Sequence, residues 1–184
     1  MIHKPNFFVF TGGPGVGKTT LLHHLRGLGE TVTEESARAV VREQMTSGGS
    51  AVPWLDNQAY ADQNGDRDIA NFDRLAQDTG RIFFDRGICD SYRANGAQPS
   101  ASLIEAIWTR RYNPRVFLFP PWREIYENDN ERKQGWDEAE ATFGKFLSAL
   151  PELGYTPVIV PKSSVEERAR FVLDCASRAQ ANTP

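Results

Sequence analysis

The chain has 184 residues, of which 40% are hydrophobic, and this length and composition fit a single domain (residues 1–184) with one well-buried core. The formal net charge of -3 gives no general electrostatic reason to expect binding to nucleic acid or to an anionic membrane. The cysteines, Cys89 and Cys175, lack metal-ligand spacing, which argues against a disulfide framework and a zinc site. Because no apolar run approaches the length of a membrane-spanning helix, we expect a soluble, cytoplasmic protein.

The first half of the chain is predicted to begin with a buried strand that leads into a glycine-rich loop. The strand is the aromatic and β-branched run at residues 7–10, and leucines at helical spacing predict a helix over residues 18–28. The elements that follow are a weak strand over 31–33, a helix over 34–41, a loop over 46–56 and a polar helix over about 57–79.

The second half predicts three further strands, each followed by a helix. These elements are strand 81–87, helix 102–111, strand 115–119, a charged stretch over 123–134, helix 137–153, strand 157–160, helix 165–179 and a disordered tail over about 180–184. In the helix over 137–153 the predicted core residues are Ala141, Phe146, Leu147 and Leu150. Strands that alternate with helices predict an α/β fold, in which helices cover both faces of a parallel sheet.

The loop after the first strand matches the phosphate-binding P-loop pattern in full, and it has the strand-to-helix context that the pattern needs. Its glycines allow successive backbone N–H groups to point at phosphate oxygens. Lys18 is predicted to bridge the β- and γ-phosphates, and the Thr19 hydroxyl to hold Mg²⁺. The predicted triphosphate site consists of Gly12, Gly13, Pro14, Gly15, Val16, Gly17, Lys18, Thr19 and Thr20.

Missing motifs narrow the class of P-loop protein. The sequence contains no Asn-Lys-x-Asp, the usual reader of guanine, so we expect ATP as the nucleotide. It also contains no Leu-Ser-Gly-Gly-Gln, and the strand over 81–87 ends in Asp85-Arg86 where ring ATPases have Asp-Glu. These absences disfavour switch GTPases, transporter ATPases and ring ATPases, and they leave a small kinase-like protein.

Two resemblances support this interpretation. Glu35-Ser36-Ala37-Arg38 and Asp85-Arg86-Gly87 resemble acceptor-site elements of small nucleoside and nucleotide kinases, including the ribosylnicotinamide kinase and thymidylate kinase groups. Over about residues 7–171 the chain also resembles a bacterial family of predicted ATPases grouped under the AAA name, in Gly-Gly-Pro-Gly-Val-Gly-Lys-Thr, Val52-Pro53-Trp54, Phe84-Asp85-Arg86-Gly87, Phe119-Pro120-Pro121-Trp122 and Val160-Pro161-Lys162. The resemblance implies a P-loop NTPase, a three-layer sandwich with five parallel strands, and a helical lid over about residues 122–136.

Three charged residues are candidates for the acceptor end of such a site. Asp85 ends a predicted strand, where it would either hold Mg²⁺ through water or take a proton from an attacking hydroxyl; the alternative is an acidic cap. Glu35 would bind or deprotonate a substrate hydroxyl, and Arg38 would hold a neighbouring polar or anionic group. Their spacing of three residues also fits a plain surface ion pair.

Two further arginines are candidates for contact with phosphate. Arg86 would stabilise the transferred or acceptor phosphate, although a structural salt bridge explains it nearly as well. Arg132, in the predicted lid, would contact the triphosphate, with a solvated helix face as the alternative. We interpret the aromatic side chains of Trp54, Trp122 and Tyr126 as packing residues.

The sequence therefore supports three functions. The first is a kinase that transfers the γ-phosphoryl group of ATP·Mg²⁺ to a nucleoside- or nucleotide-like small molecule. The second is an ATPase that acts as a nucleotide-dependent switch with an unknown protein partner. The third is a nucleotide-binding regulatory module without catalysis. A small-molecule acceptor would accelerate ADP formation in the first case, and a protein partner would do so in the second.

Overall fold

The central feature of the protein is a five-stranded parallel sheet, seen in a computed structural model that describes residues 1–92, 96–125 and 136–181. The strands lie in the order β3-β4-β2-β6-β7, and all four neighbouring pairs are parallel. Their bounds are β3 Thr31–Val32, β4 Ile82–Asp85, β2 Phe7–Gly12, β6 Arg115–Phe119 and β7 Thr156–Ile159. The predicted α/β fold with five parallel strands is therefore confirmed.

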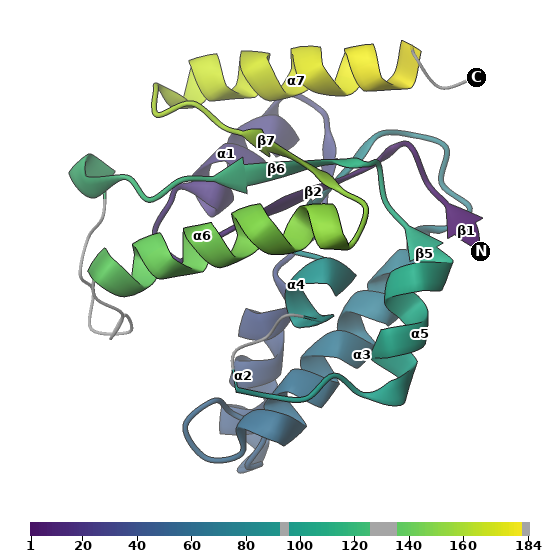
Figure 1. The fold of residues 1–184 in the computed structure, drawn as a ribbon, viewed down its shortest axis with the longest axis vertical. Coiled ribbons are helices and arrows are strands. Elements are labelled where there is room, and N and C mark those ends of the chain that lie inside the picture. The colour runs from purple at the N-terminus through teal and green to yellow at the C-terminus, as the bar shows by residue number, and fades with distance from the viewer. Residues whose placement is uncertain (93–95, 126–135, 182–184) are drawn as a thin grey trace.

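Helices lie on both faces of this sheet (Figure 1), as its three-layer architecture requires. One layer contains α1 Lys18–Gly27 and α7 Val165–Ala181, which contact each other. The other contains α3 Asn57–Leu75, α4 Ile88–Tyr92, α5 Ala101–Thr109 and α6 Trp136–Glu152, and α2 Ser36–Ser47 packs on α3. Within the described residues, no helix combines the length and the apolar character needed to cross a bilayer.

Strand β2 is buried along its whole length because it contributes to two hydrophobic clusters. Phe7 and Val9 pack in the cluster beneath α3, α5 and α6, whereas Phe8 and Phe10 pack in the cluster beneath α1 and α7. Successive side chains of a strand point to opposite faces, so a strand between two helical layers needs apolar residues at every position. This requirement explains the unbroken apolar run in the sequence.

The structure also contains short elements that the sequence analysis did not predict. Strand β1 Ile2–His3 pairs in parallel with β5 Arg110–Arg111, so α5 ends at Thr109, before the predicted end of the helix at residue 111. Helix α4 follows β4 directly and is only five residues long. Helix α3 ends at Leu75, before the predicted end at residue 79.

The predicted core face of α6 is partly wrong. Leu150 is buried as predicted and Phe146 is half-buried, but Ala141 and Leu147 are exposed. Ala139, which was not predicted, is buried instead. The apolar stripe of this helix is thus rotated relative to the predicted stripe.

The topology brings two chain segments to the same edge of the sheet. In the parallel register Phe10 of β2 lies opposite Asp85 of β4, so both strands end side by side. The glycine-rich loop follows β2, and the charged Asp85-Arg86 follows the other buried positions of β4. In open α/β sheets, ligands bind at the carboxyl ends of such neighbouring strands.

Candidate active site

The glycine-rich loop between β2 and α1 has a conformation that demands glycine at two positions. Gly12 has φ 136°, and a Cβ built there would lie 2.7 Å from the carbonyl oxygen of Phe119 on β6. Gly17 has φ 80°, and its added Cβ would lie 2.6 Å from Nη1 of Arg168. Residues with a side chain rarely adopt positive φ. Gly12 also lacks space for a side chain because the near atom belongs to the backbone, whereas at Gly17 the near atom is the end of a flexible side chain. The loop therefore has the tight curvature expected of a phosphate-binding loop.

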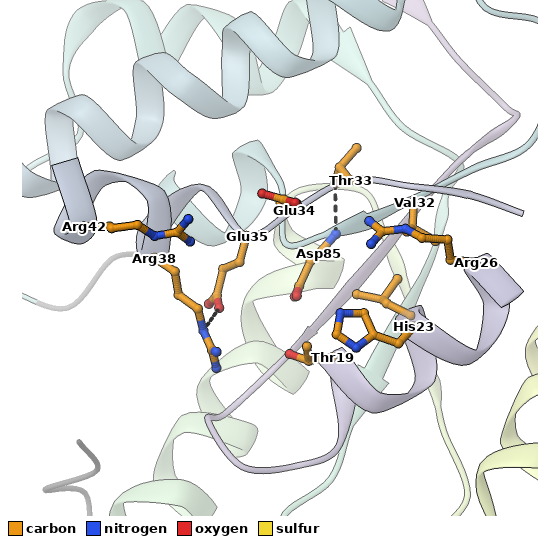
Figure 2. Close-up of a pocket in the computed structure, with 11 residues that line it drawn as sticks. Thr19, His23, Arg26, Val32, Thr33, Glu34, Glu35, Arg38, Arg42 and Asp85 are labelled. Atoms are coloured by element: carbon orange, nitrogen blue, oxygen red, sulfur yellow. Dashed lines mark hydrogen bonds and ion pairs between the residues drawn. The ribbon is translucent and has the colours of Figure 1, made fainter. Parts of the chain in front are cut away.

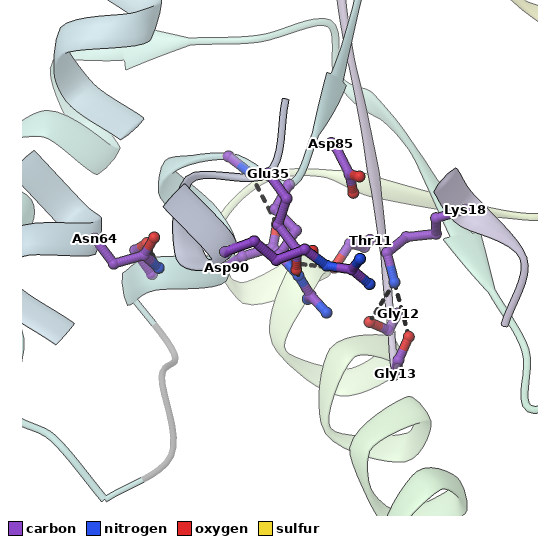
Figure 3. A network of polar contacts seen from close by, with 12 residues as sticks. Thr11, Gly12, Gly13, Lys18, Glu35, Asn64, Asp85 and Asp90 are labelled. Carbon is purple, nitrogen blue, oxygen red and sulfur yellow. Dashed lines mark hydrogen bonds and ion pairs between the residues drawn. The ribbon is translucent and has the colours of Figure 1, made fainter. Parts of the chain in front are cut away.

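Lys18, the first residue of α1, is buried beneath this loop. Its Nζ donates hydrogen bonds to the carbonyl oxygens of Gly12, at 3.2 Å, and Gly13, at 2.7 Å (Figure 3). Burial, together with the nearby Arg86, lowers the pKa of Lys18 to about 7, against the opposing effect of Asp85 and Glu35. An anion bound in the loop would supply the negative charge that favours the ammonium form.

Asp85 ends β4 and is 5% exposed. Its backbone N–H donates to the Thr33 hydroxyl at 3.2 Å, but its Oδ1 atom has no hydrogen-bond partner among the described residues. Burial raises the pKa of Asp85 to about 6, although Lys18 opposes that shift. Buried polar atoms are rarely left without a partner, so a free carboxylate oxygen here indicates a place for a ligand, a metal or water.

Arg86 joins the acidic residues of this edge into one network. It has φ 67°, which is unusual for a residue other than glycine, and its N–H donates to the Phe10 carbonyl at 3.0 Å. Its guanidinium lies between two carboxylates, with Nε 2.8 Å from Glu35 Oε1 and Nη1 3.1 Å from Asp90 Oδ1. These acids raise the pKa of Arg86 despite its burial, so the guanidinium is held charged and fixed.

Asp90, on α4, ties this network to the strand that enters the glycine-rich loop. Its Oδ1 accepts a hydrogen bond from the Thr11 hydroxyl, and its Oδ2 accepts one from the Gly87 N–H at 3.2 Å. Asp90 and Thr11 are both buried. The sequence analysis missed both residues, although Asp90 follows Arg86 by four positions, a spacing that allows an ion pair on a helix.

Glu35 is paired on both of its oxygens. Oε1 accepts from Arg86, and Oε2 accepts from Nε of Arg38 at 2.8 Å. Burial alone would raise the pKa of Glu35, but the neighbouring cations Arg86, Lys18 and Arg38 hold it below its usual value. The predicted pair of Glu35 with Arg38 is therefore present, and the residue also belongs to the buried network.

A pocket opens beside these residues, between α1, the segment after β3 and the start of α2 (Figure 2). In the picture, Thr19 of α1 lies below Asp85, with Glu35 to one side. The lining residues are Thr19, Leu22, His23, Arg26, Val32, Thr33, Glu34, Glu35, Arg38, Arg42 and Asp85. It therefore contains the predicted metal ligands Thr19 and Asp85 together with the predicted acceptor residues Glu35 and Arg38.

Behind the network, α3 buries polar side chains where a helix usually buries apolar ones. Asp68 accepts a hydrogen bond from the Ser91 hydroxyl at 2.6 Å, and that hydroxyl accepts one from Asn64 Nδ2 at 3.0 Å. Within the described chain, Asn64 Oδ1 is buried without a partner. Burial raises the pKa of Asp68 to about 6. None of these residues was a sequence-based candidate.

Arg168, on α7, holds the other side of the glycine-rich loop. Its Nη1 donates to the Gly17 carbonyl at 3.3 Å, and its guanidinium lies 5.4 Å from the centre of the Trp122 ring. Trp122 is half-buried, so its predicted packing role agrees with the structure. Trp54 is 64% exposed, so its predicted packing role is wrong. Arg132 and Tyr126 lie outside the described residues, as does most of the predicted lid.

In the part of the chain that the structure describes, no group of three His, Cys, Asp or Glu side chains is arranged to hold a metal ion. Mg²⁺ in triphosphate sites is usually bound by one or two protein groups plus phosphate oxygens, so such a cluster is not required.

The fold and the loop define the class of the protein. A parallel sheet, a glycine-rich loop after its central strand and a buried lysine at the start of the next helix make the chain a P-loop NTPase with a kinase-like fold, the class of enzymes that contains both small kinases and ATPases. The AAA domain family model matches residues 7–168, so the chain belongs to that family. No curated protein sequence matches the chain.

Solved structures with the same fold include several small-molecule kinases. NadR in complex with NR has a TM-score of 0.67 at 20% identity, covering 99% of this chain and 53% of NadR. Thymidylate kinase from Ehrlichia chaffeensis has a TM-score of 0.60 at 15% identity, covering 95% and 99% of the two chains. Shikimate kinase from Acinetobacter baumannii, in complex with shikimate, has a TM-score of 0.55 at 14% identity, covering 96% and 95%. At these identities the likeness concerns the fold.

Proposed function

We propose that the protein is a kinase that transfers the γ-phosphoryl group of ATP to a nucleoside- or nucleotide-like small molecule. The observation that carries the proposal is the buried Asp85 carboxylate, which lines a pocket and has one oxygen without a partner among the described residues. Asp85 also lies opposite Phe10 of β2, the strand that enters the P-loop. A site that only hydrolysed ATP would not need the ordered pairs Glu35–Arg86 and Glu35–Arg38 at the wall of that pocket.

The residues present fit a triphosphate with Mg²⁺. The N–H groups of residues 12–20 and the start of α1 would bind the phosphates, and Lys18 would exchange its bonds to the Gly12 and Gly13 carbonyls for bonds to phosphate oxygens. Thr19 would hold Mg²⁺, which offsets the negative charge of the triphosphate when it is bound. Asp85 could hold the ion through water instead, but its free Oδ1 equally supports a role as proton acceptor.

In the proposed reaction the chain mainly positions charged groups. Lys18 stabilises charge on the γ-phosphoryl group, and Arg86 is held by Glu35 and Asp90 at the edge where that charge develops. Glu35 and Arg38 form the wall that orients the acceptor. The proposed contact of Arg132 with the triphosphate rests on the sequence, because this residue lies outside the described part of the chain.

The test is ADP formation from Mg²⁺·ATP, with and without a panel of nucleosides, nucleotides, hydroxy acids and phosphorylated vitamins. Lys18→Ala is the blank. Asp78→Asn, at an exposed aspartate in the turn after α3, is the matched control for Asp85→Asn. Stimulation by one compound, with an equal amount of phosphorylated product, supports the kinase. ADP formation that is indifferent to every compound refutes it and favours the ATPase switch.

A further inference from the structure

The chemistry of the acceptor follows from the charges at this edge, if the proposed kinase function holds. We infer that the acceptor presents an uncharged hydroxyl group, as a nucleoside does, and that it does not present a phosphate. The product is then a phosphate monoester and not a diphosphate. Three features of the described residues carry this inference: the acids at the edge, the pairing of the cations there, and the free oxygen of Asp85.

Buried carboxylates gather at the inner edge of the site, whereas the arginines that line the pocket are exposed. Asp85 and Asp90 are 5% and 7% exposed, and the Glu35 side chain is 15% exposed. A phosphate acceptor would bring up to two negative charges to this wall, beside the negative γ-phosphoryl group. Like charges that are only partly screened by water repel strongly, whereas a hydroxyl can donate a hydrogen bond to the same oxygens.

The inner cations are already engaged, so they leave little to bind a second phosphate. Arg86 is bonded to Glu35 and to Asp90, and Lys18 serves the P-loop. Arg38 is bonded to Glu35 through Nε only, and its side chain is 63% exposed, so it belongs with the cations at the solvent side of the pocket. A site built for a phosphate acceptor usually keeps a guanidinium open at its inner wall, so that two parallel N–H groups can meet two phosphate oxygens.

The remaining cations of the pocket lie at its solvent side. Arg26 on α1 and Arg42 on α2 line the pocket, and neither has an ion pair within the described residues. Both residues are exposed, so water and salt screen their charge. They can meet a polar tail of the acceptor, but they do not neutralise charge at the inner wall.

As a proton acceptor, Asp85 has a task only with a hydroxyl acceptor. As the acceptor oxygen forms its bond to the γ-phosphorus, the bond from that phosphorus to the β–γ bridging oxygen breaks, and ADP leaves with the electron pair. The hydroxyl proton must then go to a base. Asp85 lines the pocket, and its buried Oδ1 has no hydrogen-bond partner among the described residues. A phosphate dianion carries no proton to remove, so a carboxylate beside it would only repel it.

Matched pairs of acceptors test the inference. Each ribonucleoside and deoxyribonucleoside is assayed beside its own 5′-monophosphate, with uncharged polyols and hydroxy acids as further hydroxyl compounds, and the product is identified by ³¹P NMR. We expect only phosphate monoesters as products, and a kcat/KM for the preferred nucleoside at least about a hundredfold above that of its monophosphate. A diphosphate product, or preference for the monophosphate, overturns the inference while the kinase stands. No transfer to any compound overturns the kinase itself.

Variants separate the charge argument from a merely structural effect. Glu35→Gln removes the carboxylate that occupies Arg86 and Arg38, so the ratio of kcat/KM for nucleoside over monophosphate should fall by about tenfold or more. With ADP filling the P-loop, the same variant should also bind the monophosphate more tightly in a calorimetric titration. Glu43→Gln on α2, which breaks the pair of Glu43 with Arg67 on α3, should leave both values unchanged. An unchanged ratio in Glu35→Gln would contradict the inference.

Discussion

The substitution Asp68→Asn should remove much of the pH dependence of folding stability in the mildly acidic range. Asp68 is 5% exposed, and burial raises its pKa from 3.8 to about 6. The folded protein therefore binds this proton more tightly than the unfolded chain does. Below about pH 4 the carboxyl is protonated in both states, and as the pH rises to about 6 only the unfolded chain ionises freely, so stability falls.

The magnitude follows from the pKa difference between the two states. A difference of about 2 units corresponds to about 3 kcal/mol, of which about 2 kcal/mol is lost between about pH 4.5 and about pH 7.5. Urea unfolding of the wild type and of Asp68→Asn across this range measures the loss, and Asp66→Asn, at an exposed position of α3, is the control. The wild type should lose about 2 kcal/mol more than Asp68→Asn. Parallel curves for these two proteins would refute the reasoning.

Four other substitutions test the loop and the charged edge. Lys18→Ala should abolish binding of ATP or its turnover, measured by titration and ADP formation, and near-normal values would refute the P-loop role. Asp85→Asn should spare ATP affinity but lower turnover by about a hundredfold or more. Unchanged kinetics would show that Asp85 is only an acidic cap. Gly17→Ala should destabilise the fold by about 1–3 kcal/mol in urea unfolding, because of its positive φ and its contact with Arg168; an unchanged midpoint would contradict this. Arg132→Ala should weaken affinity for a nonhydrolysable ATP analogue, and unchanged affinity and turnover would count against a lid role.

The sheet could be predicted from the sequence because local sequence patterns identify its main strands. An apolar run such as β2 must be buried on both faces, and the P-loop pattern confirms which strand is central. The place of Asp85 beside the pocket could be predicted for the same reason, since the carboxyl ends of neighbouring parallel strands lie at one edge of the sheet. The short strands β1 and β5 carry no such signal, because two residues establish no period.

The face of α6 shows where periodicity becomes ambiguous. Ala139, Phe146 and Leu150 share the side that meets the sheet, while Leu147 is exposed one position away. The sequence offers apolar residues on two overlapping stripes, and only packing against β6 and β7 selects one. The ion pair of Arg86 with Asp90 was hard to predict for a similar reason. Arg86 was a candidate from the sequence, but its partner Asp90 is placed by the short helix α4.

The buried polar face of α3 could not be predicted because pattern analysis equates burial with apolar character. Asn64 and Asp68 lie four residues apart, so they share a face, and their common partner Ser91 comes from α4. Asn71, three residues further, donates to the Ser36 hydroxyl at 3.2 Å, directly after the paired Glu35. Burying Asp68 costs stability above its pKa, and well-packed apolar residues would stabilise these helices more. The polar face is therefore better explained by its place behind the charged edge than by the needs of the core: it fixes α2, α3 and α4 through directional bonds and so sets the position of Glu35 and Asp90.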